Sequence, residues 1–366
     1  MEGAETRRSG RHKVTLKGTT FIMRSIKFGY QFDFRNPPGS GRSFAEVYRE
    51  MFRQAERAEE LGFDSLWLTE HHFTDDGYLP AMIPMASALA ARTTRVTIGT
   101  YVLLAPFHHP VKLAEETAVT DVIANGRLRL GLGLGYRQEE FDGFEIARTE
   151  RLGRTLETID ILRHAWTGER FDFAGKYFNF RGVRVLPRPI SQPHPEILWG
   201  GATAKAIQRA ARLDLGFACV GGRREIGIYH EALKQLGKNP APYSVVASRV
   251  VYIAASEEQA WTEAGPAMMY QAELYARWIA AGYGSDPNRA FIRPDPERLK
   301  RSAILGPIDH VRRRLEEVIA DTPLTEFIVC TQLPGLDPAK AYRSLEAFGK
   351  EILPTIKLGI AKTVVG

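Results

Sequence analysis

The sequence is poor in cysteine and has no long hydrophobic run. Cys219 and Cys330 are its only cysteines, each in an apolar stretch and far from the other, which disfavours a disulfide framework or a zinc site and predicts two reduced, buried thiols. Residues 1–25 lack the apolar segment and cleavage site of a secretory signal, and no later run is long enough to span a bilayer. We therefore expect a cytoplasmic protein with no membrane partner.

A strong charge of one sign is also absent from most of the chain. The formal net charge is +6, but much of this excess lies in residues 1–25, which we predict to be a flexible basic leader. The basic residues of the leader include Arg7, Arg8, Arg11, Lys13 and Lys17. Because the excess charge is concentrated there, the basic composition is weak evidence for nucleic acid, and no nucleic-acid partner is expected.

What the sequence does contain is a regular alternation of strands and helices. IKFGYQF at 26–32 and FDSLWL at 63–68 have the composition of strands. Between them, Ser43 and Glu46 form a capping box, and apolar residues then repeat at helical spacing. Six further strand-like segments follow, with helical segments between them, near 95–103, 127–135, 196–201, 215–222, 243–255 and 324–332.

Eight strands, each followed by a helix, predict an α/β fold of the (β/α)8 TIM-barrel type. We expect one domain over residues 26–356 and a short tail at 357–366. Two segments are predicted to be insertions, about 167–194 before the fifth strand and about 257–305 after the seventh. Since the loops that follow barrel strands open at one end, the second insertion should cover the catalytic mouth.

A doubly wound dinucleotide-binding sheet is the rival architecture. The glycines of GLGLGY at 131–136 resemble its fingerprint, but Tyr136 stands where a third glycine or alanine is needed. No acidic residue follows at the required distance after a strand, so this architecture is disfavoured.

The second strand ends in an unusual group of polar residues, Glu70, His71 and His72. Neighbouring side chains of a strand point to opposite sides, so we expect one histidine to face the cavity and the other to pack or hydrogen-bond sideways. A neutral imidazole can take up and return a proton. The segment is therefore a candidate for general acid/base catalysis, with two purely structural histidines as the alternative.

A metal centre is a further alternative, because His108 and His109 follow the third strand. Barrel metal enzymes usually present ligands that alternate along a strand or repeat at helical spacing, with carboxylates completing the set. Here the histidine pairs are adjacent in sequence and lie on separate loops. A metal hydrolase is therefore disfavoured, and we assign no metal ligands.

The segment WGGATAKA at 199–206 follows the fifth strand and has the features of a phosphate loop. Gly200 and Gly201 leave the backbone bare, and Thr203 can cap the helix that begins there. Free amides in the first turn of a helix bind phosphate. A cofactor with a phosphate group would fit this loop, although a loop that only turns the chain would look similar.

Taken together, these stretches resemble the bacterial luciferase-like flavin-dependent monooxygenase family. EHHF, followed at matching distances by G-T-x-V and H-P-V, is the most specific part of the resemblance. It extends from about residue 26 to residue 353 and includes GFDSLWLTEHHFTDDG, GTYVLLAPFHHPVKLAEE, NGRLRLGLGLGYRQEEF, EILWGGATAKA and LGPIDHVRRRLEEVIA.

The resemblance implies a barrel that holds reduced FMN at its mouth. Reaction with oxygen would give a peroxyflavin that oxidises a small organic substrate by hydroxylation or Baeyer–Villiger insertion. His71 would be the general acid/base, supported by Glu70 and His72, and a non-prolyl cis peptide would join Tyr101 to Val102 against the flavin ring. The implied cofactor-binding residues are Tyr101, Val102, Gly133, Tyr136, Gly200, Gly201, Ala202 and Thr203.

The resemblance also implies partners. A separate NAD(P)H flavin reductase would supply the reduced flavin, and a homodimer would form through the helices at 81–91 and 111–124. Two alternatives keep the same fold: an oxidoreductase that transfers hydride with a deazaflavin coenzyme, and a non-catalytic luciferase-like subunit. The paired histidines favour FMN over the deazaflavin, and His71 together with an intact glycine loop favours an enzyme over the subunit.

Overall fold

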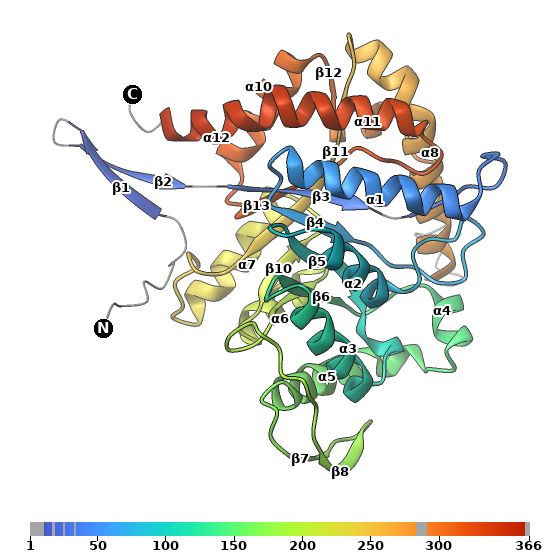
Figure 1. The fold of residues 1–366 in the computed structure, drawn as a ribbon, viewed down its shortest axis with the longest axis vertical. Coiled ribbons are helices and arrows are strands. Elements are labelled where there is room, and N and C mark those ends of the chain that lie inside the picture. The colour runs from blue at the N-terminus through green and yellow to red at the C-terminus, as the bar shows by residue number, and fades with distance from the viewer. Residues whose placement is uncertain (1–10, 17–18, 25, 33, 283–290, 363–366) are drawn as a thin grey trace.

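The computed structural model describes residues 11–16, 19–24, 26–32, 34–282 and 291–362, and its centre is a closed parallel barrel (Figure 1). Eight strands pair in the order β10-β9-β6-β5-β4-β3-β13-β11, and β11 pairs with β10 to close the ring. The predicted TIM barrel is confirmed. Its strands are β3 (Lys27–Phe32), β4 (Ser65–Leu68), β5 (Thr97–Leu104), β6 (Leu128–Gly133), β9 (Glu196–Gly200), β10 (Gly216–Cys219), β11 (Val245–Ile253) and β13 (Glu326–Cys330).

Helices between the strands form the outer layer, and the capping box predicted for the first of them is present. Ser43 Oγ accepts from the Glu46 N–H at 3.3 Å, and the Glu46 carboxylate accepts from the Ser43 N–H at 2.7 Å. The helices of this layer are α1 (Phe44–Glu60), α2 (Met82–Arg92), α3 (Pro110–Ile123), α5 (Arg151–Ala165), α6 (Ala204–Arg212), α7 (Arg223–Gln235), α10 (Ile308–Asp321), α11 (Pro338–Ala347) and α12 (Leu353–Lys362).

The largest side chain of the inner barrel cluster is that of Trp67. A Cβ added to Gly29 or to Gly99 would lie 2.6 Å or 2.4 Å from its indole ring. These two inward-facing positions have room for a hydrogen atom only, because the tryptophan takes the volume that side chains from several strands would otherwise share. Leu198, Ala218, Val246 and Ile328 complete this inner cluster.

Glycines on β6 and β9 accommodate an irregular segment of β5. The register between β5 and β6 shifts between Thr100 and Leu103, and the peptide bond from Tyr101 to Val102 is cis, as the resemblance implied. A Cβ on Gly133 would lie 2.4 Å from Val102 Cγ2, and one on Gly200 would lie 2.9 Å from Val102 Cγ1. The glycines of these two strands thus leave space for Val102.

Both predicted insertions are present. The first contains an antiparallel ribbon of β7 (Phe171–Ala174) and β8 (Asn179–Val183). The second contains α8 (Glu257–Gly282) and α9 (Pro296–Ser302) and leads into β12 (Ile304–Gly306), which pairs with the end of β11. Strand β12 was not predicted, because three residues are too few to show the alternation by which a strand is identified. The extent of the single domain, 26–356, stays a prediction.

A hairpin of β1 (Arg11–Leu16) and β2 (Thr19–Arg24) lies in the predicted leader and extends away from the barrel in Figure 1. The flexibility of this leader stays a prediction. Cys219 and Cys330 are buried and form no disulfide, as expected. In the part of the chain that the structure describes, no helix combines the length and hydropathy needed to cross a membrane. Shorter elements are α4 (Gln138–Gly143), η1 (Ala105–Phe107), η2 (Arg148–Glu150) and η4 (Phe348–Ile352).

Candidate active site at the barrel mouth

His71 lies directly after β4 and is held by a buried carboxylate. Its Nδ1 is 2.8 Å from Oε1 of Glu140, which also accepts the backbone N–H of His72 at 3.0 Å. A carboxylate only accepts hydrogen bonds, so Nδ1 carries the hydrogen atom. The other ring nitrogen, Nε2, is left with its lone pair and lies 3.5 Å from the hydroxyl of Tyr136.

The surroundings of His71 favour its neutral form. Burial lowers the pKa of His71 below its ordinary value of 6.5, and the hydrogen bond to Glu140 opposes this effect without cancelling it. Burial also raises the pKa of the Tyr136 phenol, so that group stays protonated. The pair presents a neutral imidazole and a neutral phenol at the mouth, which suits proton transfer near neutral pH.

His72 has a different carboxylate partner. Its Nε2 is 2.9 Å from Oε1 of Glu70, and Nε2 of His108 is 3.6 Å from the same oxygen. The other oxygen of Glu70 accepts the backbone N–H of Leu104 at 2.6 Å. Burial alone would raise the pKa of Glu70, but the interactions with His108 and His72 outweigh it and lower the pKa to about 2. Glu70 is thus a fixed anion that joins the ends of β4 and β5.

Aromatic rings enclose His71. The ring centroids of Trp278, Tyr78, Tyr136 and Tyr275 lie 4.7, 5.0, 5.5 and 5.8 Å from that of the imidazole, and His71 is 5% exposed. Tyr275 and Trp278 come from α8, so the second insertion covers this part of the mouth, as predicted. The rings exclude water from around the imidazole.

A buried ion pair and the hydroxyl groups of tyrosines connect α8 to the loops that follow β3 and β4. Arg35, in the loop after β3, contacts Asp76 at 2.6 Å, and both side chains are at most 1% exposed. The hydroxyl of Tyr270 in α8 donates to the same oxygen of Asp76 at 3.0 Å, and the hydroxyls of Tyr275 and Tyr78 are 2.8 Å apart. These contacts connect residues almost 200 positions apart, and none of them was predicted from the sequence.

No role for Glu140 was predicted from the sequence, and neither were the contacts of Arg137, the residue that precedes α4. The guanidinium of Arg137 donates to the carbonyl oxygen of His72 at 2.7 Å and stacks on Trp278 at 4.2 Å. Within the described residues, Oε2 of Glu140 and Nε of Arg137 are buried and have no hydrogen-bond partner. A signal was available, because RQEE at 137–140 places a basic and an acidic residue one helical turn apart directly after a barrel strand.

The residues expected to hold a flavin ring do not all lie together. Tyr101 and Val102 pack on top of the inner barrel cluster and are half-buried, so they offer a floor for a planar ring. Val102 contacts the positions of both Gly133 and Gly200. Tyr136 lies apart from this floor, beside His71.

The loop after β9 fits a phosphate group. Ala202 and Thr203 are exposed, and Thr203 Oγ1 caps α6 by accepting the N–H of Ala206 at 3.3 Å. A Cβ on Gly201 would lie 2.7 Å from Cβ of Ala206, so the loop approaches the first turn of α6 closely. The other amides of that turn face solvent at the positive end of the helix dipole.

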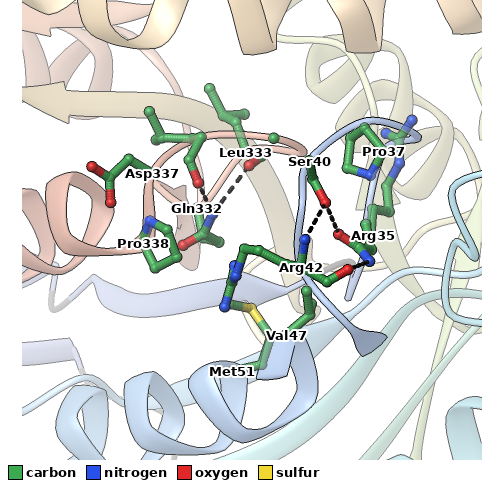
Figure 2. Close-up of a pocket in the computed structure, with 13 residues that line it drawn as sticks. Arg35, Pro37, Ser40, Arg42, Val47, Met51, Gln332, Leu333, Asp337 and Pro338 are labelled. Carbon is green, nitrogen blue, oxygen red and sulfur yellow. Dashed lines mark hydrogen bonds between the residues drawn. The ribbon is translucent and has the colours of Figure 1, made fainter. Parts of the chain in front are cut away.

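A cavity of about 330 Å³ lies between the loops that follow β3 and β13 (Figure 2). Ser40 donates to Asn36 at 2.6 Å and accepts from the N–H of Arg42 at 3.2 Å. The amide of Gln332 donates to the carbonyl oxygens of Leu333 and Leu336. These polar side chains bond to one another and to the backbone, so we assign no ligand to this cavity.

The described residues contain no group of three or more His, Cys, Asp or Glu side chains arranged to hold a metal ion. Glu70 connects His72 to His108, while His71 pairs with Glu140.

A family model and several curated proteins are similar to this chain. A family model described as luciferase-like monooxygenase matches residues 26–326. The oxygenase component of a flavin-dependent trigonelline monooxygenase from Acinetobacter baylyi is 26% identical over 297 residues, covering 74% of this chain and 80% of that protein. An F420-dependent glucose-6-phosphate dehydrogenase from Amycolatopsis mediterranei is 34% identical over 182 residues, covering 48% of this chain and 54% of that protein.

Solved structures share the fold. A monooxygenase from Streptomyces bottropensis superposes with a TM-score of 0.78 at 29% identity, covering 90% of this chain and 100% of that one. The oxygenating constituent of 3,6-diketocamphane monooxygenase from Pseudomonas putida, a type II Baeyer–Villiger enzyme in complex with FMN, gives a TM-score of 0.77 at 23% identity. It covers 90% of this chain and 98% of that one.

Proposed function

Because this chain belongs to the luciferase-like monooxygenase family and is an oxidoreductase of that family, we propose that it is a monooxygenase that uses reduced FMN and O2. The substrate is a small organic molecule, and the outcome is hydroxylation or Baeyer–Villiger oxygen insertion. The observation that carries the proposal is the imidazole of His71, which Glu140 holds through Nδ1 so that the lone pair of Nε2 is available at the mouth.

Each part of the mouth then has a role. Reduced FMN, when bound, supplies the electrons and the centre that activates oxygen. Tyr101, Val102 and Gly133 would support its ring, Tyr136 would face the reacting region next to His71, and the loop formed by Gly200, Gly201, Ala202 and Thr203 would bind its phosphate. His71 takes up and returns a proton at Nε2, while Glu140 acts as a positioning residue that fixes the tautomer. Glu70 and His72 hold the loop that carries His71.

We also propose a two-component system in which a separate NAD(P)H-dependent reductase supplies the reduced flavin. The relatives named as an oxygenase component and as an oxygenating constituent support this proposal. A cytoplasmic location agrees with such a supply of reductant and with Cys219 and Cys330 being reduced rather than joined in a disulfide.

The proposed assembly is a homodimer through α2 and α3. On α3, Val119, Val122 and Ile123 are 43%, 39% and 44% exposed, which makes this helix face a suitable subunit contact. Light scattering should give twice the mass of the 41.0 kDa chain. A monomeric mass at micromolar concentration would exclude this assembly.

A second candidate is hydride transfer with the deazaflavin coenzyme F420. The 34% identity to an F420-dependent dehydrogenase is the observation that favours it. Anaerobic titrations with reduced FMN and, separately, with reduced F420 distinguish the two candidates. Saturable binding of FMN in the micromolar range supports the monooxygenase, whereas tight binding of F420 without binding of FMN would replace it by the dehydrogenase.

The role of His71 is tested with the flavin-loaded protein. A panel of small aldehydes, ketones and aromatic compounds, each with and without an acid group, is mixed with oxygenated buffer, and mass spectrometry detects the added oxygen atom. For an accepted substrate, we expect His71→Gln to lower the rate of oxygenation about 100-fold while reduced FMN still binds. His164→Gln, at an exposed position of α5, is the matched control and should retain the full rate.

A further inference from the structure

The wall of the barrel has a gap at the mouth, on one edge of β11. Strand β10 pairs with β11 from Phe217↔Val245 to Cys219↔Ala247. On the same edge, β12 pairs with β11 only from Val251↔Ile304 onward. Residues 248–250 lie between these two pairings, and a cavity of about 630 Å³ opens beside them.

The cavity has a positively charged lining. Three arginines, Arg249, Arg301 and Arg314, contribute to it, and none of the described residues that line it is an aspartate or a glutamate. The remaining wall combines neutral polar and apolar side chains. These include Ser248, Gln271, Ser302, Met268, Leu299 and Val318.

Arg249 differs from the other two arginines in its partners. Arg301 lies 3.8 Å from Asp295, and Arg314 pairs with Glu317. Arg249 donates to the carbonyl oxygens of Ser248 at 2.8 Å and Gly221 at 2.9 Å, and it forms no ion pair with a carboxylate in the described part of the chain. Glu225 attracts Arg249 only from beyond ion-pair contact, and its carboxylate already accepts the N–H of Gly222 at 2.9 Å. A half-buried guanidinium that is oriented by two carbonyl groups and has no carboxylate in contact favours an anion beside it.

The cavity is adjacent to the candidate active site. Tyr275 lines it, and the ring centroid of this tyrosine is 5.8 Å from that of His71. A molecule bound in the gap can therefore extend along α8, past Met268 and Tyr275, toward the imidazole. The arginines of the cavity would bind one end of such a molecule, and the aromatic rings around His71 would contact the other end.

We propose that this gap binds the anionic group of an organic acid substrate, namely a carboxylate, sulfonate or phosphate group, with Arg249 as the specificity-determining residue. The oxygenation of that substrate rests on the proposed function, whereas binding of the anion does not. The other source of an anion at the mouth is the phosphate of FMN, which we have placed at the loop after β9. The experiment below separates these two sources.

Inorganic phosphate is the first probe, used without flavin. Calorimetric titrations at constant ionic strength compare the wild type, Arg249→Gln and the control Arg313→Gln, which removes the same charge from an exposed position of α10 that does not line the cavity. We expect saturable binding by the wild type and the control, and binding weakened about tenfold or more in Arg249→Gln. Equal affinity in all three proteins would overturn the proposal.

The flavin phosphate is tested by comparing reduced FMN with reduced riboflavin, which lacks the phosphate. If the gap binds the substrate, Arg249→Gln leaves the preference for FMN over riboflavin unchanged. If the variant loses this preference, the gap binds the cofactor phosphate and the substrate assignment is wrong. A failure to bind either flavin, combined with Arg249-dependent phosphate binding, would instead refute the proposed function and retain the anion site.

Arg249 also holds the loop at Gly221, so its replacement can affect folding as well as binding. Arg249→Lys keeps the charge, and Arg301→Gln alters the rim of the cavity and leaves Arg249 in place. We expect partial recovery of phosphate affinity in the first variant and a smaller loss than in Arg249→Gln in the second. If Arg249→Lys binds phosphate no better than Arg249→Gln while both melt at the wild-type temperature, charge at this position is not what binds the anion.

Discussion

The two ends of the barrel interior contain the same kinds of buried polar residue, but they differ in how completely those residues are paired. At the end where the strands begin, Glu326 uses both oxygens: Oε1 accepts from Ser65 and from Trp67, and Oε2 accepts from Arg129 at 2.5 Å. At the mouth, Glu140 uses only Oε1, and its buried Oε2 has no partner among the described residues.

This difference distinguishes a carboxylate that stabilises the fold from one that can take part in binding or catalysis. A buried carboxylate whose donors are all protein groups stabilises the barrel and has no capacity left for a ligand. A buried carboxylate with a free oxygen costs stability, and such a cost is commonly found at functional sites. The polar residues where the strands begin are thus structural, and those at the mouth hold the candidate site, in agreement with the division of roles in barrel enzymes.

The same isosteric substitution should have very different effects at the two ends. In Glu326→Gln, one oxygen becomes an N–H donor that faces another donor, and Arg129 loses its fully buried counter-ion, so we expect a loss of about 3–5 kcal/mol in the free energy of unfolding. In Glu140→Gln, the amide nitrogen can occupy the place of the unpartnered Oε2, and the loss should be under about 1.5 kcal/mol. Urea denaturation at neutral pH measures both, and equal losses would contradict the contrast.

A second test compares two glycine-to-alanine substitutions, for which we expect opposite changes in the free energy of unfolding. The Cβ of Gly133→Ala would meet Val102 at 2.4 Å, so we expect a loss of about 1–3 kcal/mol and weaker binding of reduced FMN. Gly227 lies in α7 with nothing within 4 Å of an added Cβ, and Gly227→Ala should stabilise the protein by about 0.5–1 kcal/mol. Thermal melting and flavin titration check both variants, and a stable Gly133→Ala protein would show that the bulge of β5 is free to move.

The smallest expected effect is a dependence of the free energy of unfolding on pH. Since the pKa of His71 is lowered from 6.5 by burial, the unfolded chain binds a proton in a window below pH 6.5 in which the folded protein does not. Stability should therefore fall as the pH falls through this window, by at most about 1.4 kcal/mol for each unit by which the pKa is lowered.

Urea midpoints measured between neutral pH and pH 5 isolate this contribution. His71→Asn should flatten the dependence, and Glu140→Gln should steepen it, because it removes an interaction that raises the pKa of His71. His164→Asn, at an exposed position, is the control. If the urea midpoint of His71→Asn depends on pH as strongly as that of the wild type, groups other than His71 cause the dependence.

Much of the fold could be predicted from the sequence because its signals are local. The capping box at Ser43 and the apolar strand segments each lie within a few residues of the element that they specify, and the order of strands and helices then selects the barrel. Strand β12 and the short helix α4 have too few residues to produce a periodic pattern, and neither was predicted.

The candidate site could be predicted only where the chain itself brings its residues together. Glu70, His71 and His72 are adjacent, so the segment could be identified. The pairing of His71 with Glu140 joins residues 69 positions apart, and the contact of Tyr270 with Asp76 joins residues 194 positions apart. In the sequence, Glu140 lies in the acidic run QEEFD and resembles an exposed helix residue, whereas in the fold it is fully buried. Only the closed barrel determines which of these carboxylates faces the imidazole.

The indole of Trp67 inside the barrel makes three distant positions interdependent. Gly29, Trp67 and Gly99 lie on three adjacent strands, and the two glycines have no room for a methyl group while the tryptophan is present. In evolution, a smaller residue at position 67 would have to be accompanied by larger residues at 29 and 99, and neither change is accessible alone without a cavity or a clash. These positions should therefore covary as a set among family members, and a designer who wishes to reshape the barrel interior must replace all three at once.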